Sequence, residues 1–331
     1  MKKRLRSNYK KRRNYVPQKK EFHTKEGIFL SRMASILLVP PNKVKGLFSR
    51  RAITTIRINP LKGDVEKIVK LLEKRDYELD DIEWAPNAFF VRNKDKSEIS
   101  HTQEYKDGLF YIQNLSSILP TIVLDPKEGE NILDMCAAPG SKTTHICAVT
   151  NNNANIIAND DDSVRIGSLR NVLHQFGAKA KISLSDGCLL WRKYPDYFDK
   201  ILLDAPCSGE GLIYLNSSKP LRRWTIRKIK VSTIIQRDLI SSAFRALKPG
   251  GTLVYSTCTL EPDENEGVVT ELLTRYENAK IEKIKIDGLR GMNRGITKWS
   301  GNKYPQEVAK TMRVLPSAKM MGFYVAKITK V

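Results

Sequence analysis

The sequence predicts a doubly wound α/β fold, in which helices cover both faces of a parallel sheet. Five short apolar segments alternate with stretches that carry apolar residues at helical spacing, the order expected of parallel strands joined by crossover helices. Glycine and proline turns separate these elements, and several of the apolar segments end on an aspartate or run into a cysteine. At 331 residues with 41% hydrophobic content, the chain is long enough for this sheet and a smaller second unit.

The chain divides into three parts. Residues 1–24 form a basic tail with ten Lys or Arg against one Glu, and its low apolar content predicts disorder when it is free. Residues 25–107 are predicted to form a small N-terminal α+β domain, and residues 108–331 the α/β domain. Within the small domain we expect a strand over 54–59, a helix over 64–75 and a strand over 89–92.

The first strand of the α/β domain leads into a loop suited to meet a ligand. Residues 131–134 are a short apolar strand that ends on Asp134, and a helix is expected from Ser141 onward. The loop Met135-Cys-Ala-Ala-Pro-Gly140 between them matches neither the dinucleotide nor the triphosphate fingerprint. Its small residues nevertheless permit close approach of a ligand to the backbone.

The second strand, residues 155–158, is followed by the acidic run Asn159-Asp-Asp-Asp162. Asp160 stands where an acidic side chain can accept hydrogen bonds from ribose hydroxyls. The alternative is that the run caps the helix over 165–176, with Asp162 or Ser163 as the N-cap.

The third strand (182–185) ends in Asp186, the fourth (201–203) in Asp204, and the fifth (252–257) at Cys258, after a helix over 236–247. Pro206 stops the fourth strand, so Cys207 lies just past its end. Taken alone, that stretch fits a buried cysteine under a turn equally well. A packed core has no use for the whole set of carboxylates and thiols at strand ends, and ligands of parallel sheets bind at that edge. The set therefore indicates a reaction centre.

Charge and cysteine usage narrow the class of protein. The net charge of +21 and pI of 9.7 indicate nucleic acid as the first partner and an anionic membrane surface as the second. No apolar run approaches the roughly 18–20 residues of a membrane span, and the basic N-terminus lacks the apolar region of a signal peptide. We therefore expect a cytoplasmic protein. Five cysteines without a C-x-x-C pair and four scattered histidines predict neither a disulfide framework nor a metal site.

Three motifs carry a resemblance to a known family. The segments DMCAAPGSKT (134–143), DAPCSGEG (204–211) and YSTCTLEPDENE (255–266) resemble those of the Sun/Fmu-type (RsmB/NOP/NSUN) RNA cytosine-C5 methyltransferases. The resemblance implies a Rossmann-like class I methyltransferase domain over 108–331, S-adenosylmethionine as cofactor and RNA as partner. Residues 25–107 resemble, less sharply, the small RNA-binding domain that precedes it. A departure is Ser317, where many relatives carry a His.

The resemblance also implies catalytic roles. Cys258 resembles the nucleophile that adds to C6 of cytosine, which makes C5 reactive toward the methyl group. Cys207 resembles the thiol that assists release of the product, and Asp204 the group that binds the cytosine ring. Lys142 matches an active-site lysine, which near the thiol would lower its pKa.

Cofactor contacts follow from the same resemblance. They are expected from the backbone of the loop, from the ribose side and from the adenine and methionine ends, and the residues are Cys136, Ala137, Ala138, Pro139, Gly140, Ser141, Lys142, Asp160, Arg165, Asp186 and Asp204. The side chains of Cys136, Cys147 and Cys188 are interpreted as packing residues.

Two basic regions are candidates for RNA contact. Arg50, Arg51 and Arg57 in the small domain are either a solvated face or an RNA-facing surface. Farther along the chain, basic residues surround Trp224, which suits a phosphate track with a stacked base, or else a solvated helix face. Those basic residues are Lys219, Arg222, Arg223, Arg227, Lys228 and Lys230. The target cytosine must leave its stack to reach a thiol in a pocket.

Three functions remain open from the sequence. A tRNA 5-methylcytosine methyltransferase is favoured over an rRNA enzyme because residues 295–299 and 313–326 look like archaeal tRNA-modifying relatives. A non-catalytic RNA-binding or ribosome-assembly factor is disfavoured by the presence of both cysteines. An enzyme that methylates an amino group is disfavoured because it needs no thiol and usually carries an Asn/Asp-Pro-Pro-aromatic motif, where this chain has Asp204-Ala-Pro-Cys207.

Overall fold

The computed structural model describes residues 24–331. The basic tail expected over residues 1–24 therefore lies outside the described residues, except for Thr24. The Thr24 side chain accepts a hydrogen bond from the Gly27 N–H and so caps α2 (Lys25–Leu37).

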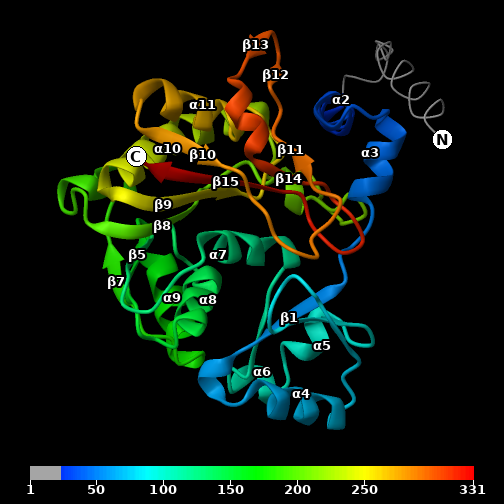
Figure 1. Ribbon diagram of the computed structural model, residues 1–331. Coiled ribbons are helices and arrows are strands. Elements are labelled where there is room, and N and C mark those ends of the chain that lie inside the picture. Colours follow the sequence, from blue (N-terminus) through cyan, green and yellow to red (C-terminus); the bar gives the residue numbers. More distant parts are fainter. Residues whose placement is uncertain (1–23) are drawn as a thin grey trace.

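Five parallel strands form one side of the large sheet, up to its edge strand, and their parallel order was predicted (Figure 1). Their order in space is β9-β8-β5-β6-β7, and each ends at the same edge because they run in the same direction. The strands are β5 (Asn131–Asp134), β6 (Asn155–Asp160), β7 (Lys181–Leu184), β8 (Phe198–Asp204) and β9 (Leu247–Thr257).

The sheet is extended beyond β9 by antiparallel strands that the sequence did not predict. β15 (Phe323–Lys330) pairs with β9 and brings Tyr324 opposite Thr257. On its other side β15 pairs with β14 (Met312–Val314) and, at its far end, with β10 (Ala279–Glu282); β11 (Asn293–Arg294) pairs with β14. These strands lack the helical crossovers that marked the parallel ones in the sequence.

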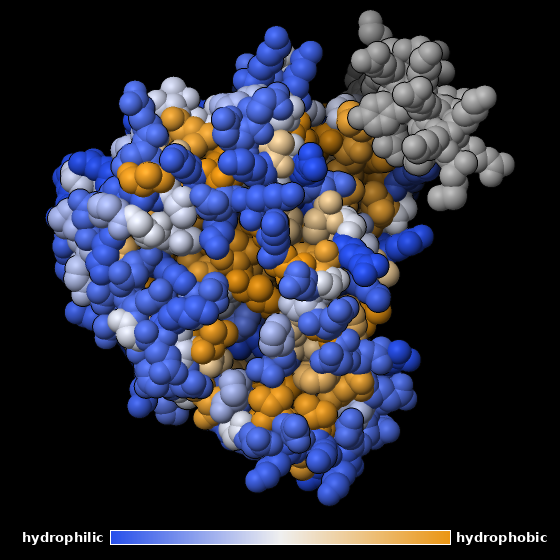
Figure 2. Space-filling model, viewed as in Figure 1, coloured by the Kyte–Doolittle hydropathy of each residue, from blue (hydrophilic) through white to orange (hydrophobic). Residues whose placement is uncertain are grey.

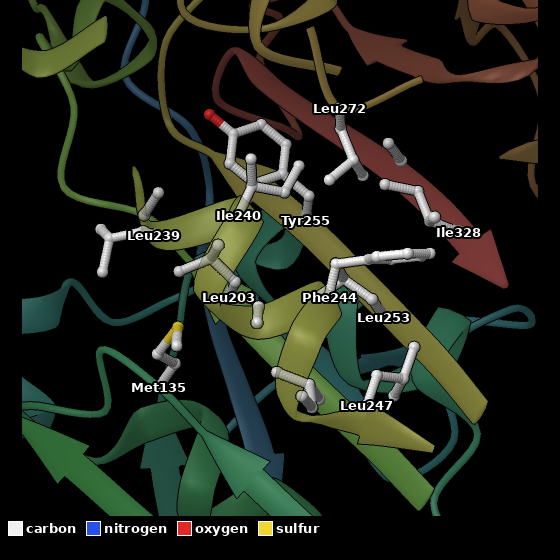
Figure 3. Close-up of a cluster of buried hydrophobic side chains, with 14 of the residues drawn as sticks. Met135, Leu203, Leu239, Ile240, Phe244, Leu247, Leu253, Tyr255, Leu272 and Ile328 are labelled. Atoms are coloured by element: carbon white, nitrogen blue, oxygen red, sulfur yellow. The ribbon is translucent and has the colours of Figure 1, made fainter. Parts of the chain in front are cut away.

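Helices cover both faces of the large sheet because alternate strand residues point to opposite sides. Leu203, Leu253 and Tyr255 belong to the apolar cluster under α10 (Ile226–Ala246) and α11 (Glu266–Arg275), which Figure 3 shows. Their neighbours Leu202 and Val254 belong to the opposite cluster. That second face carries α7 (Leu119–Leu124) and α8 (Ser141–Val149), while α9 (Ser163–Gln175) packs beside the β6–β7 edge.

Helix α10 begins ten residues before the position expected from its apolar pattern. Thr225 accepts a hydrogen bond from the Lys228 N–H and acts as the N-cap, so the basic residues Arg227, Lys228 and Lys230 belong to the first turns of the helix.

The small sheet has the order β2-β3-β1-β4. It consists of β1 (Thr54–Ile58), β2 (Leu79–Asp81), β3 (Ala88–Val91) and β4 (Phe110–Ile112), with α4 (Val65–Lys74), α5 (Lys96–Ile99) and α6 (Gln103–Lys106) beside it. Asp64 caps α4 through the Lys67 N–H. Strand β4 pairs with β1, so the small sheet continues through Ile112.

Arg57 is not part of an RNA-facing surface, contrary to one of the two interpretations above. Its side chain is buried, and its guanidinium donates hydrogen bonds to Gln113, to Thr144 and to the Ser141 carbonyl. Burial lowers its pKa to about 10. Arg57 therefore joins the small sheet to the start of α8, and only Arg50 and Arg51 of that group are exposed.

Helices α2 and α3 (Pro41–Phe48) pack against the large unit and away from the small sheet (Figure 1). Phe29 of α2 lies edge-on against Trp224, with ring centroids 5.3 Å apart. Trp224 is 3% exposed, and its Nε1–H donates to Glu210 at 2.7 Å. The expectation that Trp224 stacks on an RNA base is therefore wrong: the indole is a core residue whose apolar partner lies about two hundred positions earlier in the chain.

Within residues 24–331, no helix combines the length and apolar character of a membrane span. Figure 2 shows that most of the viewed face is hydrophilic, with separate apolar patches on the large unit, in the middle of the view and on the small sheet.

Candidate active site

Two thiols meet at the carboxyl edge of the large sheet. In the parallel register Asp204 of β8 lies opposite Ser256 of β9, so the residues that follow the two strands come together. Cys207 Sγ and Cys258 Sγ are 3.2 Å apart, and both side chains are partly buried. Gly209 lies beside them, because a Cβ built there would be 4.0 Å from the Cys258 sulfur.

The environment distinguishes the two thiols. The pKa of Cys207 is raised well above its ordinary value, first by the hydrogen bond with Cys258 and then by burial. Cys207 therefore keeps its proton and can donate it in a hydrogen bond to the Cys258 sulfur.

Asp204 is held from two sides. The Lys142 ammonium lies 2.6 Å from Oδ2, and the Ser256 hydroxyl donates to Oδ1 at 2.7 Å. Lys142 also donates to the Ser117 hydroxyl at 2.9 Å, and its Nζ lies 5.8 Å from the centre of the Phe323 ring. The structure thus places Lys142 on the Asp204 carboxylate, and fixes the carboxylate for a directed hydrogen bond to a ligand.

A buried carboxylate network joins the two thiol-bearing loops. Ser208, which follows Cys207, and Thr259, which follows Cys258, both donate hydrogen bonds to the carboxylate of Glu210. Glu264 accepts hydrogen bonds from the Ser208 N–H and from Gln236, and Gln236 also binds the Pro206 carbonyl. The network thus fixes the positions next to both cysteines: Pro206 and Ser208 beside Cys207, and Thr259 beside Cys258.

Burial raises the pKa of these carboxyl groups above the ordinary range. The pKa of Glu264 is raised to about 8, first by burial and then by the neighbouring Glu210. Burial likewise raises the pKa of Glu261 to about 7, against the attraction of Arg32, which lies 2.6 Å away. The acidic run after Cys258 therefore forms the internal support of the thiol loops, a role that its sequence alone does not indicate.

The loop between β5 and α8 is fixed by its own backbone. The Ala137 N–H donates to the Asn159 carbonyl at 2.7 Å, and the Ala138 N–H to Asp160 at 3.1 Å. Gly140 adopts a φ of +113°, and a Cβ there would lie 3.0 Å from Leu169 and Val172. The first N–H groups of α8, from Ser141 onward, are not used by the helix itself.

Two of the residues expected to contact the cofactor, Asp160 and Arg165, form hydrogen bonds and an ion pair within the protein. Asp160 is buried; besides Ala138, it accepts a hydrogen bond from the Asp162 N–H and pairs with Arg165 at 3.2 Å. Arg165 also donates to the Ala138 carbonyl at 2.5 Å. Asp186, by contrast, is exposed, and uses one oxygen to cap the turn at Cys188. Asp162 caps α9, which confirms the helix-capping interpretation of the acidic run.

The other three cysteines pack against apolar clusters. Cys147 is buried beside α7 and the sheet, and Cys136 and Cys188 lie against the cluster under α10. Burial raises the pKa of Cys147 and of Cys188 to about 12. None is poised as a nucleophile. In the part of the chain that the structure describes, no group of three or more His, Cys, Asp or Glu side chains could hold a metal ion.

Several site residues were missed by the sequence. Ser256 stands inside a quoted motif but had no assigned role, and Ser117 carries no motif at all. Glu210 and Glu264 lie within the motifs, where an acidic side chain is normally interpreted as solvent-exposed. Only the register between β8 and β9 reveals that these side chains meet.

Comparison with known proteins identifies related sequences over most of the chain. The family model for 16S rRNA methyltransferase RsmB/F matches residues 121–329, and that for the N-terminal domain of 16S rRNA methyltransferase RsmF matches residues 27–115. The tRNA (cytosine(49)-C(5))-methyltransferase of Pyrococcus abyssi is 43% identical over 281 residues, 83% of this chain and 88% of that protein. The ribosomal RNA small subunit methyltransferase F of Shewanella loihica is 36% identical over 84% of this chain. The chain spans about half of that protein, since the match covers 56% of it.

Two solved structures have the same fold over most of this chain. A methyltransferase homologue from Pyrococcus horikoshii has a TM-score of 0.80 at 32% identity, with 92% of this chain and 95% of that chain covered. NSun6 from Pyrococcus horikoshii, solved with SFG, has a TM-score of 0.74 at 25% identity, with 93% and 98% covered.

Proposed function

Because this chain belongs to the RsmB/F family of S-adenosylmethionine-dependent RNA cytosine-C5 methyltransferases, we propose that it methylates C5 of a cytosine in tRNA through a covalent bond to Cys258. The observation that carries the proposal is the pair of thiols, 3.2 Å apart, at the edge of the sheet beside Asp204. The preference for tRNA is supported by the relative from Pyrococcus abyssi, whose match extends over 88% of its length.

The residues at the sheet edge fit S-adenosylmethionine. Asp160, Asp186 and Asp204 stand at the ends of β6, β7 and β8 and offer carboxylates for hydroxyl and amino groups and for a cationic sulfur. The backbone of Cys136 to Lys142 would receive the amino-acid part at the start of α8. Arg165, the more exposed partner of Asp160, would give way to the ribose. When bound, the cofactor supplies an electrophilic methyl group on a sulfonium.

The chain's own groups then act in order. The Cys258 thiolate adds to C6 of the cytosine, which breaks the C5–C6 double bond and makes C5 nucleophilic. Asp204, fixed by Lys142 and Ser256, binds the ring and stabilises the charge that develops on it. C5 takes the methyl group. Loss of the C5 proton and cleavage of the C6–sulfur bond then restore the double bond and the Cys258 thiolate.

Cys207 serves the last step. Its hydrogen bond to Cys258 is the largest cause of its raised pKa, and that bond is lost once the Cys258 sulfur is bonded to C6. The Cys207 sulfur lies 3.2 Å from the sulfur that carries the base; once its proton has passed to water, its thiolate accepts the proton from C5.

The test is methyl transfer from labelled S-adenosylmethionine to unmodified tRNA transcripts and to 16S rRNA. Wild type should form 5-methylcytosine in tRNA, and Cys258→Ala should lose at least about a thousandfold of that rate. Cys207→Ala should accumulate a covalent RNA adduct that survives denaturing electrophoresis. Cys147→Ala, a change in a packing cysteine, is the matched control and should retain turnover.

Other outcomes select other functions. Labelling of 16S rRNA in preference to tRNA would assign the chain to the rRNA branch. Absence of label in both RNAs with intact RNA binding would favour a scaffold role. Turnover that persists in Cys258→Ala would refute the covalent mechanism.

A further inference from the structure

A basic groove opens beside the thiol-bearing loops, and of its lining only Arg50 and Arg51 were considered above, as either a solvated face or an RNA-facing surface. It has a volume of about 990 Å³ and lies between the small sheet and the large unit. Four segments line it: residues 50–54 between α3 and β1, residues 91–98 at the start of α5, residues 211–214 after Cys207, and the loop from β14 to β15. We propose that this groove binds the single-stranded RNA segment that flanks the target cytosine, an inference that rests on the proposed function.

The walls of the groove are joined by backbone hydrogen bonds. The Ile53 N–H donates to the Ala318 carbonyl at 2.9 Å, which ties the segment before β1 to the β14–β15 loop. The Leu215 N–H donates to the Phe48 carbonyl at 2.8 Å. Figure 1 shows the chain between α3 and β1 passing close to the β14–β15 loop. The groove is therefore formed in the free protein, which lowers the cost of ordering a bound strand.

The charges in the groove suit phosphates. Arg50, Arg51 and Lys96 are exposed, and within residues 24–331 none of them forms an ion pair. The two acidic residues of the lining, Asp95 and Glu98, are occupied with each other's N–H groups in a capping box. The cations are thus free for phosphates, while the anions are committed to the turn.

The groove also offers apolar surface for bases. Leu212 is 54% exposed and Ile53 is 40% exposed, unusual values for large aliphatic side chains. Tyr214 lies under the guanidinium of Arg51, whose Cζ is 4.9 Å from the ring centre. Cations beside an aromatic ring and apolar side chains are the combination that binds single strands through phosphates and base faces. From the sequence we expected this combination around Trp224, but the indole of Trp224 is buried and cannot stack on a base.

One end of the groove is at the reaction centre. Gly211 lines the groove, and its N–H donates to the Cys258 carbonyl at 2.9 Å. Ser317 lines it from the β14–β15 loop, where its hydroxyl accepts a hydrogen bond from the Met320 N–H at 3.0 Å. A strand held along Arg50 and Arg51 would therefore lead to the thiols, and the base at that end must leave its stack to enter.

The test compares charge reversals with equal total charge. Arg50→Glu with Arg51→Glu should raise KM for an unmodified tRNA transcript about tenfold, with the loss carried by KM rather than kcat. The slope of log binding constant against log salt should fall by about 1.4, or about 0.7 for each lost phosphate contact. Lys280→Glu with Lys283→Glu changes two exposed residues in and after β10 and should alter neither the KM nor the slope.

A second measurement needs no variant. A transcript with 4-thiouridine beside the target cytosine should crosslink on irradiation to peptides that contain residues 50–54 or 211–214. Crosslinks confined to the exposed residues of α10 would overturn the groove, as would an unchanged KM in the Arg50/Arg51 variant. Wild-type methylation that depends on Cys258 would still stand in either case, so failure of the groove is distinguishable from failure of the proposed function.

Discussion

At the scale of single residues, buried carboxyl groups hold the loops that carry Cys207 and Cys258. Ser208 and Thr259, each one position after a cysteine, share Glu210, and Glu264 binds the Ser208 backbone. Three carboxyl groups of the large unit, on Asp134, Glu261 and Glu264, have their pKa raised to about 7, 7 and 8 by burial. In the folded protein these carboxyl groups therefore keep their protons to higher pH than in the unfolded chain, where they would ionise at about pH 4.5.

These raised pKa values predict how stability depends on pH. Between about pH 4.5 and 8 the folded protein binds protons that the unfolded chain has lost, so the free energy of unfolding falls as pH rises, by about 1.4 kcal/mol per pH unit for each such proton. Glu264→Gln mimics the protonated carboxyl and should flatten the decline between about pH 5 and 8 in chemical denaturation. Glu277→Gln, at an exposed position, should keep the wild-type slope; equal slopes in all three proteins would refute the assignment to Glu264.

The sequence predicted some of these residues and not others, for a physical reason. Cys207, Cys258 and Asp204 follow strands of a parallel sheet, so their meeting is a consequence of strand order that the pattern already contains. The burial of Arg57 and Trp224 depends on partners that no local pattern identifies: the start of α8 for the guanidinium and Phe29 for the indole. Basic and aromatic residues close together in sequence therefore indicated a surface that the fold places elsewhere.

At the scale of elements, the thiol loops meet β15 through two glycines. A Cβ on Gly211 would lie 1.9 Å from the Gly322 carbonyl oxygen and 2.9 Å from that of Cys258, so neither backbone could stay in place. This contact needs the antiparallel strands beyond β9. The five parallel strands were predictable because apolar runs alternate with helices; β15 was not, because it returns without a crossover.

This contact predicts opposite effects for two glycine substitutions. Gly211→Ala should destabilise the protein by about 1–3 kcal/mol, as overpacking does, and should lower kcat by displacing Cys258. Gly167→Ala, in the middle of α9 with nothing within 4 Å of the added methyl group, should stabilise by up to about 1 kcal/mol. Thermal unfolding and methyl transfer measure both. Equal stability of the two variants would contradict the close approach of Gly211 to Gly322.

At the scale of the whole molecule, the charge of +21 is distributed between a folded part and the first 23 residues, which contain ten Lys or Arg and one Glu. We predict that deletion of residues 1–23 weakens RNA binding and flattens its salt dependence, while methyl transfer at saturating RNA persists. Filter binding of a tRNA transcript at several salt concentrations measures the effect. An unchanged slope would mean that the tail contributes no phosphate contacts.

From the closeness of Cys207 and Cys258 we predict that oxidants inactivate the resting enzyme. The two sulfurs, 3.2 Å apart, need to approach by only about 1.2 Å to form a disulfide bond of ordinary length, with loss of two hydrogen atoms to the oxidant. Such a bond would consume, in a single event, the thiol that we propose as nucleophile and the thiol that we propose to release the product, and a reducing agent would restore both. Bound RNA would protect against it whenever Cys258 is engaged with the base. During turnover, the bond between the Cys258 sulfur and the base would therefore also prevent that sulfur from forming a disulfide.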